Sequence, residues 1–263
     1  MTEYVLYNAP QSTCSQRVRF VLNAKNLAFE EHVLDLFSGE QLRPEYLAIN
    51  PNGVVPALIH RGHTILDSSV IIEYLDEVAN EVVCFTPPTP ERKALMRWMM
   101  RYVDEIPAPA IRVPSYNLAF LPHFQKMSEE DFLALANSKP LRKEFLLSMG
   151  RTGFPQKEMD QALDKLNRTV VRMNEWITQN KGSWIMGDDL SLVDIAVMPV
   201  IVRMADINLD NSWSDKPLIN AWLENIRSHP VFKKTYYAGS LLTEKYPHLS
   251  FLRDKKDLIS GSA

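Results

Sequence analysis

The feature that most constrains the fold of this chain is a proline-rich segment, Thr86–Pro90, at which the sequence pattern changes. Before this segment, short apolar runs typical of strands alternate with helical spacings, whereas after it apolar residues recur almost only at helical spacing. Closely spaced prolines stiffen the backbone and stop regular secondary structure. The pattern therefore predicts an α/β domain over residues 1–80, a linker over residues 81–90 and an all-helical domain over residues 91–263.

The first domain is expected to contain strands and helices in the order β-α-β-α-β-β-α. Its last helix would be capped by Ser68 or Ser69, since serine is a favoured N-cap residue. The expected strands cover residues 4–7, 29–36, 54–59 and 64–66, and the expected helices cover residues 17–25, 45–49 and 70–78.

Beyond the linker, apolar residues at helical spacing predict helices over residues 94–106 and 159–177 and from Ser191 onward. Another helix is expected over Glu129–Asn137, but the rest of the stretch from 114 to 153 shows no clear period.

Composition excludes several classes of protein. The 263 residues include 29 basic and 32 acidic side chains, a net charge of −3, so no basic surplus is available for a nucleic-acid backbone. No apolar run approaches the length of a membrane span, and two cysteines are too few for a disulfide framework. We expect a cytoplasmic protein with no nucleic-acid partner, no membrane partner and no metal site.

A polar cluster, Gln11–Gln16, lies between the first predicted strand and the first predicted helix. Thr13 and Gln16 have the spacing of a capping box, which would place Cys14 and Ser15 in the first helical turn. Free backbone N–H groups there favour an anion, and hydroxyl donors favour a deprotonated thiol. The cluster is either an ordinary helix cap or a site that holds a thiolate, of Cys14 itself or of a bound thiol.

Two further features point to the same kind of ligand. Val55–Pro56 places a proline in a predicted strand, which must then lie at a sheet edge or break there. A cis bond would turn the Val55 N–H and C=O outward, where an extended peptide could pair with them. Asp67 and Ser68 begin a helix, either as an ordinary cap or as a cradle for the ammonium and carboxylate of an amino acid. Glutathione carries a thiol, a peptide backbone and an amino-acid head group.

The chain resembles the cytosolic glutathione transferases. The resemblance covers nearly the whole chain to about residue 235 and implies a thioredoxin-like domain, an all-helical domain, a cis Val55–Pro56 bond and a dimer. Its second half includes what looks like the family's capping box and hydrophobic staple. The motifs that carry the resemblance are Ser12–Arg19, Asn50–Pro56, Asp67–Ser68, Gly187–Asp188 and Ser191–Ala196.

Within the family, the first motif is most similar to the zeta class of maleylacetoacetate isomerases and to tetrachlorohydroquinone reductive dehalogenases. Ser12, Cys14 and Ser15 match the Ser-x-Cys-Ser sequence of both. The resemblance implies that Ser12 stabilises the glutathione thiolate with Cys14 beside it, and Thr13 falls where the theta class places its serine. Which of Ser12, Thr13, Cys14 or Ser15 meets the thiolate is left open.

The resemblance also assigns residues to the rest of glutathione. Gln41 would meet its glycine end, and Val55, held by Pro56, would pair with the backbone of its cysteine. Asp67 and Ser68 would bind its γ-glutamyl head group.

The chain departs from the zeta pattern at Gln16, where that class has tryptophan, and it carries extra length around Tyr116–Phe154 and beyond Tyr237. Bacterial glutathione-dependent β-etherases belong to the same superfamily, and its aromatic-processing members often carry such length. We therefore expect glutathione thiolate to attack an electrophilic carbon of a small aromatic or apolar substrate, with a β-aryl ether as one possibility. Reductive dehalogenation, cis–trans isomerisation and a non-catalytic assembly role are the alternatives.

The substrate pocket is expected to come from the helical domain, because an aromatic substrate needs apolar walls and a charged one needs an arginine. The competing interpretation places Trp98 in the core and Arg101 on a solvated face. Whether the expected dimer pairs identical or related chains is left open. The predicted pocket residues are Trp98, Arg101, Tyr102, Arg112 and Tyr116.

Overall fold

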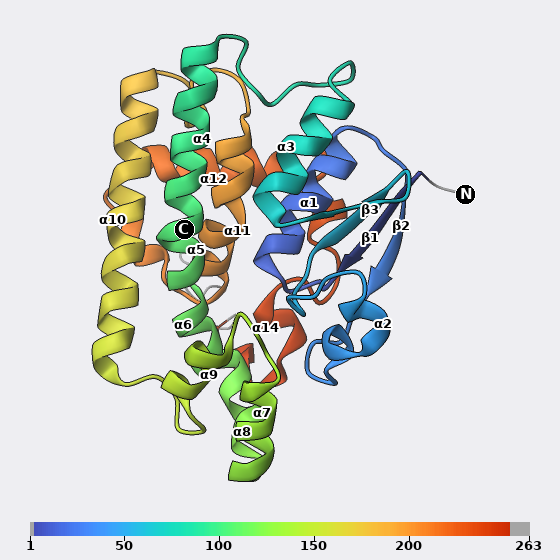
Figure 1. The fold of residues 1–263 in the computed structure, drawn as a ribbon. Coiled ribbons are helices and arrows are strands. Elements are labelled where there is room, and N and C mark those ends of the chain that lie inside the picture. Colours follow the sequence, from blue (N-terminus) through green and yellow to red (C-terminus); the bar gives the residue numbers. More distant parts are fainter. Residues whose placement is uncertain (1–2, 253–263) are drawn as a thin grey trace.

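Four strands form one mixed sheet in the order β2-β1-β3-β4 (Figure 1). The structure, a computed structural model, describes residues 3–252; the end of the predicted helical domain, residues 253–263, lies outside this range. Strand β1 is parallel to β2 and antiparallel to β3, which pairs in turn with β4. The strands are β1 (Tyr4–Asn8), β2 (Phe29–Val33), β3 (Ala57–His60) and β4 (His63–Leu66).

Strand β3 shows how the sheet accommodates Pro56. The strand begins at Ala57, directly after the proline, and lies between β1 and β4. The backbone therefore breaks at the proline and does not place it in an edge strand, because proline has no N–H for an internal ladder. The Val55–Pro56 peptide bond is cis, as the family resemblance implied.

Helices α1 (Thr13–Ala24) and α3 (Ser68–Val78) lie between the sheet and the helical domain, and α2 (Pro44–Leu47) follows a short 3-10 turn (Figure 1). Helix α1 packs against both α3 and the helical domain, so nearly all of its middle is buried. It thus belongs to the cores of both domains.

The predicted capping box of Thr13 and Gln16 is wrong. Ser12 is the N-cap of α1, and its Oγ accepts a hydrogen bond of 3.2 Å from the backbone N–H of Ser15. The Gln16 amide donates instead to the carbonyls of Pro10 and Ser240, so it cannot reach back to the cap. The helix therefore begins one residue earlier than a Thr13 cap would allow.

The N-cap of α3 also differs from the prediction. Asp67 caps this helix, with its carboxylate accepting from the backbone N–H groups of Ser69 and Val70. Ser68 and Ser69 are not caps, because both hydroxyls accept hydrogen bonds from the buried Arg17 guanidinium.

The remainder of the described chain is helical. The helices predicted near residues 94–106, 129–137 and 159–177 are present, as is the one after Ser191. The helices are α4 (Pro90–Glu105), α5 (Pro107–Ala110), α6 (Arg112–Ser115), α7 (Leu121–Gln125), α8 (Glu129–Asn137), α9 (Lys143–Met149), α10 (Gln156–Asn180), α11 (Leu192–Asp206), α12 (Pro217–Ser228), α13 (Phe232–Thr235) and α14 (Leu242–Lys245). No helix within residues 3–252 combines the length and apolar character that crossing a bilayer would require.

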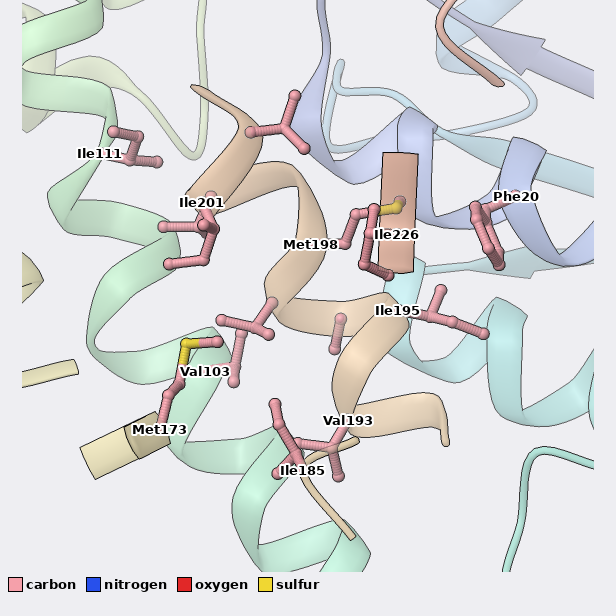
Figure 2. Close-up of a cluster of buried hydrophobic side chains, with 14 of the residues drawn as sticks. Phe20, Val103, Ile111, Met173, Ile185, Val193, Ile195, Met198, Ile201 and Ile226 are labelled. Atoms are coloured by element: carbon pink, nitrogen blue, oxygen red, sulfur yellow. The ribbon is translucent and has the colours of Figure 1, made fainter. Parts of the chain in front are cut away.

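Helix α11 forms the centre of the main core. All 15 of its residues are buried, and side chains from the surrounding helices converge on it (Figure 2). A helix that is apolar on nearly every side is stable in water only when it is surrounded in this way. Its start is fixed by the predicted capping box of Ser191 and Asp194, and Asp194 also accepts from Trp222 Nε1 at 2.7 Å. Phe20 of α1 lies in the same cluster, which joins the two domains.

Residues 116–154, here called the helical insert, form a second and smaller core. A π-helical turn over Tyr116–Phe120 leads into α7, α8 and α9, which extend away from the main bundle (Figure 1). Their apolar faces pack on one another, so the insert has a core of its own. The buried members of this core are Phe124, Phe132, Ala136, Leu146, Met149 and Phe154.

Candidate active site

A cavity lies between the N-terminal end of α1 and the helical insert. On the side of the α/β domain it is bounded by the first turn of α1, by the loop around Phe37 and by the turn that ends at Val55. On the opposite side it is bounded by α6 and by the helices of the insert. The two domains therefore contribute one side each, here called the floor (α/β domain) and the wall (helical domain).

Three of the four residues predicted to surround a thiolate line this cavity. They are Ser12, Thr13 and Cys14. Ser15 is fully buried beneath them, and its Oγ accepts a weak 3.4 Å hydrogen bond from the Ala9 N–H. Ser15 therefore supports the floor and does not line the cavity.

Buried cations hold the loop that precedes α1. Arg19 donates to the carbonyls of Ala9 and Pro10, the latter at 2.8 Å. Arg203, from the far end of α11, donates to the carbonyl of Gln11 at 2.6 Å. Each of these carbonyls is bound by a charged donor, and such hydrogen bonds are stronger than neutral ones. The sequence reasoning missed these positioning residues, although an arginine in an apolar helix such as α11 indicates a buried polar contact.

Gln41 and Val55 form the next part of the floor. Gln41 is only 3% exposed, and its Nε2 donates to the Leu36 carbonyl at 3.2 Å. Its Oε1 is buried and has no partner within the described chain, although the residue lines the cavity. Val55 also lines the cavity, whereas Pro56 lies behind it. A buried amide oxygen without a donor fits a ligand that carries an N–H group, as a peptide does.

Asp67 and Ser68, the predicted head-group residues, are outside the cavity lining. Asp67 is exposed at the start of α3, whereas Ser68 is buried. The Arg17 guanidinium, which donates to Ser68 at 3.2 Å, also contacts Asp104 of α4 at 2.6 Å. This network joins the two domains beside the cavity.

Two of the five residues predicted for the substrate pocket line the cavity, and the other three lie elsewhere. Arg112 and Tyr116 line the cavity. Trp98 and Arg101 lie on the exposed face of α4, and the Trp98 side chain is 53% exposed. Tyr102 packs against α10, where its hydroxyl hydrogen-bonds Thr169 at 3.1 Å. These three lie away from the cavity because it begins beyond the C-terminal end of α4.

The sequence reasoning also missed most of the wall. Most of these residues come from the insert, where the sequence showed no clear period except over α8, and two lie just before it. The spacing of Phe120 and Phe124, four residues apart, is the one signal that could have indicated a shared face. The missed wall residues are Ile111, Ser115, Phe120, His123, Phe124, Leu135, Lys139, Leu141, Arg142 and Leu146.

Phe37 connects the floor to the wall. It belongs to the loop after β2, but its ring lies 4.6 Å from the His123 ring and 5.4 Å from the Phe120 ring, measured between centroids. Edge and tilted contacts of this kind add to the stability gained by burial. The loop that carries Gln41 is therefore attached to the insert.

The wall is strongly basic. Burial, together with the nearby Arg142 charge, lowers the pKa of Lys139 to about 8. Burial and the charge of Arg112 lower the pKa of Arg142, whereas burial raises the pKa of the Tyr116 phenol. Burial also lowers the pKa of His123, so that its imidazole is predominantly neutral near pH 7. Within residues 3–252, no three His, Cys, Asp or Glu side chains gather as a metal site would require.

The chain was compared with known families and structures. The N-terminal domain of glutathione S-transferases matches residues 6–82, and the C-terminal domain of the same family matches residues 125–230. Protein LigF of Sphingobium sp. is 31% identical over 88% of this chain and 92% of its own. The crystal structure of the same protein, described as a β-etherase, covers 89% of this chain and 98% of its own with a TM-score of 0.80.

Other relatives belong to the classes expected from the first motif. A probable maleylacetoacetate isomerase of Caenorhabditis elegans is 30% identical over 87% of this chain and 90% of its own. The Arabidopsis thaliana glutathione S-transferase TCHQD is 25% identical over 89% of this chain and 91% of its own. Both family models match this chain in their proper order, and the fold described above has the expected two domains. The chain therefore belongs to the glutathione S-transferase family.

Proposed function

We propose that this protein catalyses attack of the glutathione thiolate on an electrophilic carbon of an aromatic substrate, and that this substrate is a β-aryl ether. Glutathione is the co-substrate of the family. The observation that carries the proposal is that the hydroxyl and thiol groups at the start of α1 share one cavity with the aromatic rings of Tyr116, Phe120 and Phe124. Similarity to the β-etherase LigF supports the choice of an ether.

Ser12 is the residue we assign to the thiolate. Its oxygen already accepts from the Ser15 N–H, which leaves its own proton available for donation into the cavity. The backbone N–H groups of the first turn add a positive potential at the same place. Thr13 and Cys14 line the cavity beside it. A hydroxyl donor at a helix N-terminus stabilises a sulfur anion and so raises the fraction of reactive thiolate at neutral pH.

The rest of the peptide would lie along the floor. Val55 would pair through its N–H and C=O with the cysteinyl backbone, as in addition of a strand, with Pro56 behind it. The unpaired Oε1 of Gln41 would accept an N–H from the glycine end. Asp67 and Ser68 would hold the ammonium and carboxylate of the γ-glutamyl group at the start of α3.

The chemical step is a displacement at carbon. A carbon–sulfur bond forms while the ether carbon–oxygen bond breaks, and the aryl oxygen leaves as a phenolate that takes a proton from water. The protein contributes by holding the sulfur at the start of α1 and the aromatic group against Tyr116 and Phe120. Fixing two reactants at attack distance removes much of the entropic barrier.

The test is a panel of three substrates offered with glutathione: a β-aryl ether ketone, a chlorinated hydroquinone and maleylacetone. We expect the ether to yield a glutathione thioether and a free phenol, both identified by mass. Turnover of only the chlorinated hydroquinone, or only maleylacetone, would replace ether cleavage by dehalogenation or isomerisation.

Cys14 supports a second candidate function, reductive dehalogenation. Its thiol lines the cavity next to the proposed thiolate position. It could attack the sulfur of a glutathionylated arene, which would release the reduced arene and leave a mixed disulfide for a second glutathione to resolve. Cys14→Ser should then abolish reduction but spare thioether formation; retained reduction contradicts this candidate.

A non-catalytic assembly role is the alternative from another class. The same fold can serve either purpose. Binding to a glutathione column together with a thiolate difference spectrum in the ultraviolet supports the enzyme, whereas the absence of both supports the assembly role.

We also propose a cytoplasmic dimer, as is typical of the family. Val70 on α3 and Trp98 on α4 are large apolar side chains that are exposed in the single chain. We propose that a partner chain covers them in the dimer. Light scattering of the purified chain should give the mass of two copies; a monomer would favour pairing with a related chain.

A further inference from the structure

Three cations of the wall have no acidic partner. Arg112 on α6, Lys139 after α8 and Arg142 before α9 all line the cavity. None of them forms an ion pair within residues 3–252, and no Asp or Glu is among the residues that line the cavity. Half-buried cations without a counter-charge are unfavourable, because burial removes part of their hydration. A hydrogen bond of 3.0 Å from Arg142 Nη1 to the Leu141 carbonyl replaces some of it but brings no negative charge.

These cations act on one another. The Arg112 and Arg142 charges both counteract part of the rise that burial causes in the pKa of the Tyr116 phenol. All three cations line the same cavity as Ser12 and Cys14, the place proposed for the sulfur. Arg203, the other cation at the cavity, is already bound to the Gln11 carbonyl and to Ser115, so it belongs to the scaffold.

Glutathione does not account for this charge. Both of its ends are assigned above to the floor, the glycine end beside Gln41 and the γ-glutamyl group at the start of α3, both in the α/β domain. Arg112, Lys139 and Arg142 belong to the opposite side, where Tyr116 packs edge-on against Phe120 and Phe145 with ring centroids 4.7 and 4.8 Å apart. A basic cluster beside aromatic rings fits a ligand that is both aromatic and anionic.

We propose that the electrophile is an aromatic acid whose carboxylate is bound by Arg112, Lys139 and Arg142. This inference rests on the proposed function and specifies that the aromatic substrate carries a negatively charged carboxylate. The guanidinium groups can bind a carboxylate through two parallel hydrogen bonds, and the ammonium adds a third donor. The aromatic part of the substrate then packs on the rings of the wall, with its reacting carbon toward the start of α1.

The inference can be tested by binding alone, without turnover. We would measure by calorimetry the affinity of the full chain for S-(para-carboxybenzyl)glutathione and for the matched S-(para-carbamoylbenzyl)glutathione, which has the same shape and no charge. The acid should bind about tenfold more tightly than the amide, as expected for a charge-assisted contact in a partly desolvated site. S-benzylglutathione reports the contribution of the aromatic ring.

Substitutions then locate the preference. Arg142→Gln and Arg112→Gln should each reduce the acid-to-amide ratio to about twofold or less, with little change in affinity for the amide. The matched control is Lys143→Gln, which removes an exposed positive charge adjacent in sequence but outside the cavity. It should leave the ratio unchanged. Because each ratio is measured within one variant, a general loss of stability does not alter its meaning.

The outcomes separate the two proposals. Equal binding of acid and amide to the unmodified chain would overturn this inference and leave the glutathione-dependent function standing. An equal loss of preference in Lys143→Gln and Arg142→Gln would also overturn it, since it would indicate the general potential of the surface. Failure of all three conjugates to bind would overturn the proposed function itself.

Discussion

The floor and the wall of the cavity differ in how their polar groups are bound. In the floor, the backbone carbonyls of Ala9, Pro10 and Gln11 are bound by buried donors, and Ser12 caps its own helix. In the wall, aromatic rings pack on one another, and the basic side chains reach the cavity without acidic partners. In the floor, these carbonyls have donors inside the protein and the Gln41 Oε1 is left for a ligand, whereas the cations of the wall have no counter-charge in the cavity lining.

The two substrates therefore meet sites that are preorganised to different degrees. A thiolate needs a donor and a positive potential at one fixed point, which a helix start held by several hydrogen bonds supplies. A second substrate is selected by shape and charge, which the side chains of the helical insert can set. The floor should therefore control reactivity, and the wall should control selectivity.

The sharpest test of the floor is Ser12→Ala. We expect kcat/KM for glutathione and a chlorodinitrobenzene to fall about 100-fold, about 2.7 kcal/mol of transition-state stabilisation, because the donor to the thiolate is lost. Steady-state kinetics and the thiolate difference spectrum measure the effect. Thr13→Ala, which removes the neighbouring hydroxyl, should cost less than about threefold. A larger loss in Thr13→Ala would transfer the thiolate contact to that residue.

Arg203→Gln tests the connection between floor and core. The substitution removes the donor from the Gln11 carbonyl inside the protein, where an unpaired polar group costs about 2 kcal/mol of unfolding free energy. Urea unfolding measures this loss. The matched surface control is Arg168→Gln, which breaks an exposed pair with Asp164 and should change stability by less than about 0.5 kcal/mol. Equal effects in the two variants would contradict a structural role for Arg203.

Phe37→Ala tests whether floor and wall are coupled. Loss of the ring removes its contacts with Phe120 and His123 and should lower stability by about 1–2 kcal/mol. The KM for the electrophile should rise about fivefold, with a smaller change for glutathione. If only the KM for glutathione rises, Phe37 acts on the floor alone.

The smallest expected effect is a pH dependence of the wall. The pKa of Lys139 lies at about 8, so its charge is present below that pH and is lost above it. Because binding of the carboxylate depends on that charge, the acid-to-amide ratio should fall about twofold to threefold from pH 7 to pH 9. His123 and Tyr116 are neutral across this range, since burial lowers the pKa of the first and raises that of the second. Lys139→Gln should flatten the profile.

Local patterns in the sequence predicted the fold well. Periodicity located the strands and the long helices, and the family resemblance indicated the capping box at Ser191, which the structure shows with Asp194. The caps of α1 and α3 were each misplaced by one or two residues, because Ser12, Thr13, Asp67 and Ser68 all have suitable side chains. Tertiary contacts decided between them, including those of Arg17 with the serines of α3.

Sequence patterns indicated the parts of the candidate site that are adjacent in the chain, but not the parts that the fold brings together. Ser12, Thr13 and Cys14 are adjacent in the chain, so one motif placed them together. To predict the wall residues, one would have to know which helix ends lie at the cavity. Periodicity shows which side of a helix is apolar but not which other elements that side contacts. Trp98, a predicted pocket residue, therefore lies outside the cavity lining, and Arg142, which follows an irregular turn, had no pattern to indicate it.

The reach of Arg203 from α11 to the loop before α1 has a consequence for heat inactivation. The same helix lies at the centre of the main hydrophobic core, so the loop that precedes Ser12 is held by a wholly buried part of the molecule. Activity and tertiary structure should disappear at one temperature, without an earlier loss of function in a still-folded enzyme.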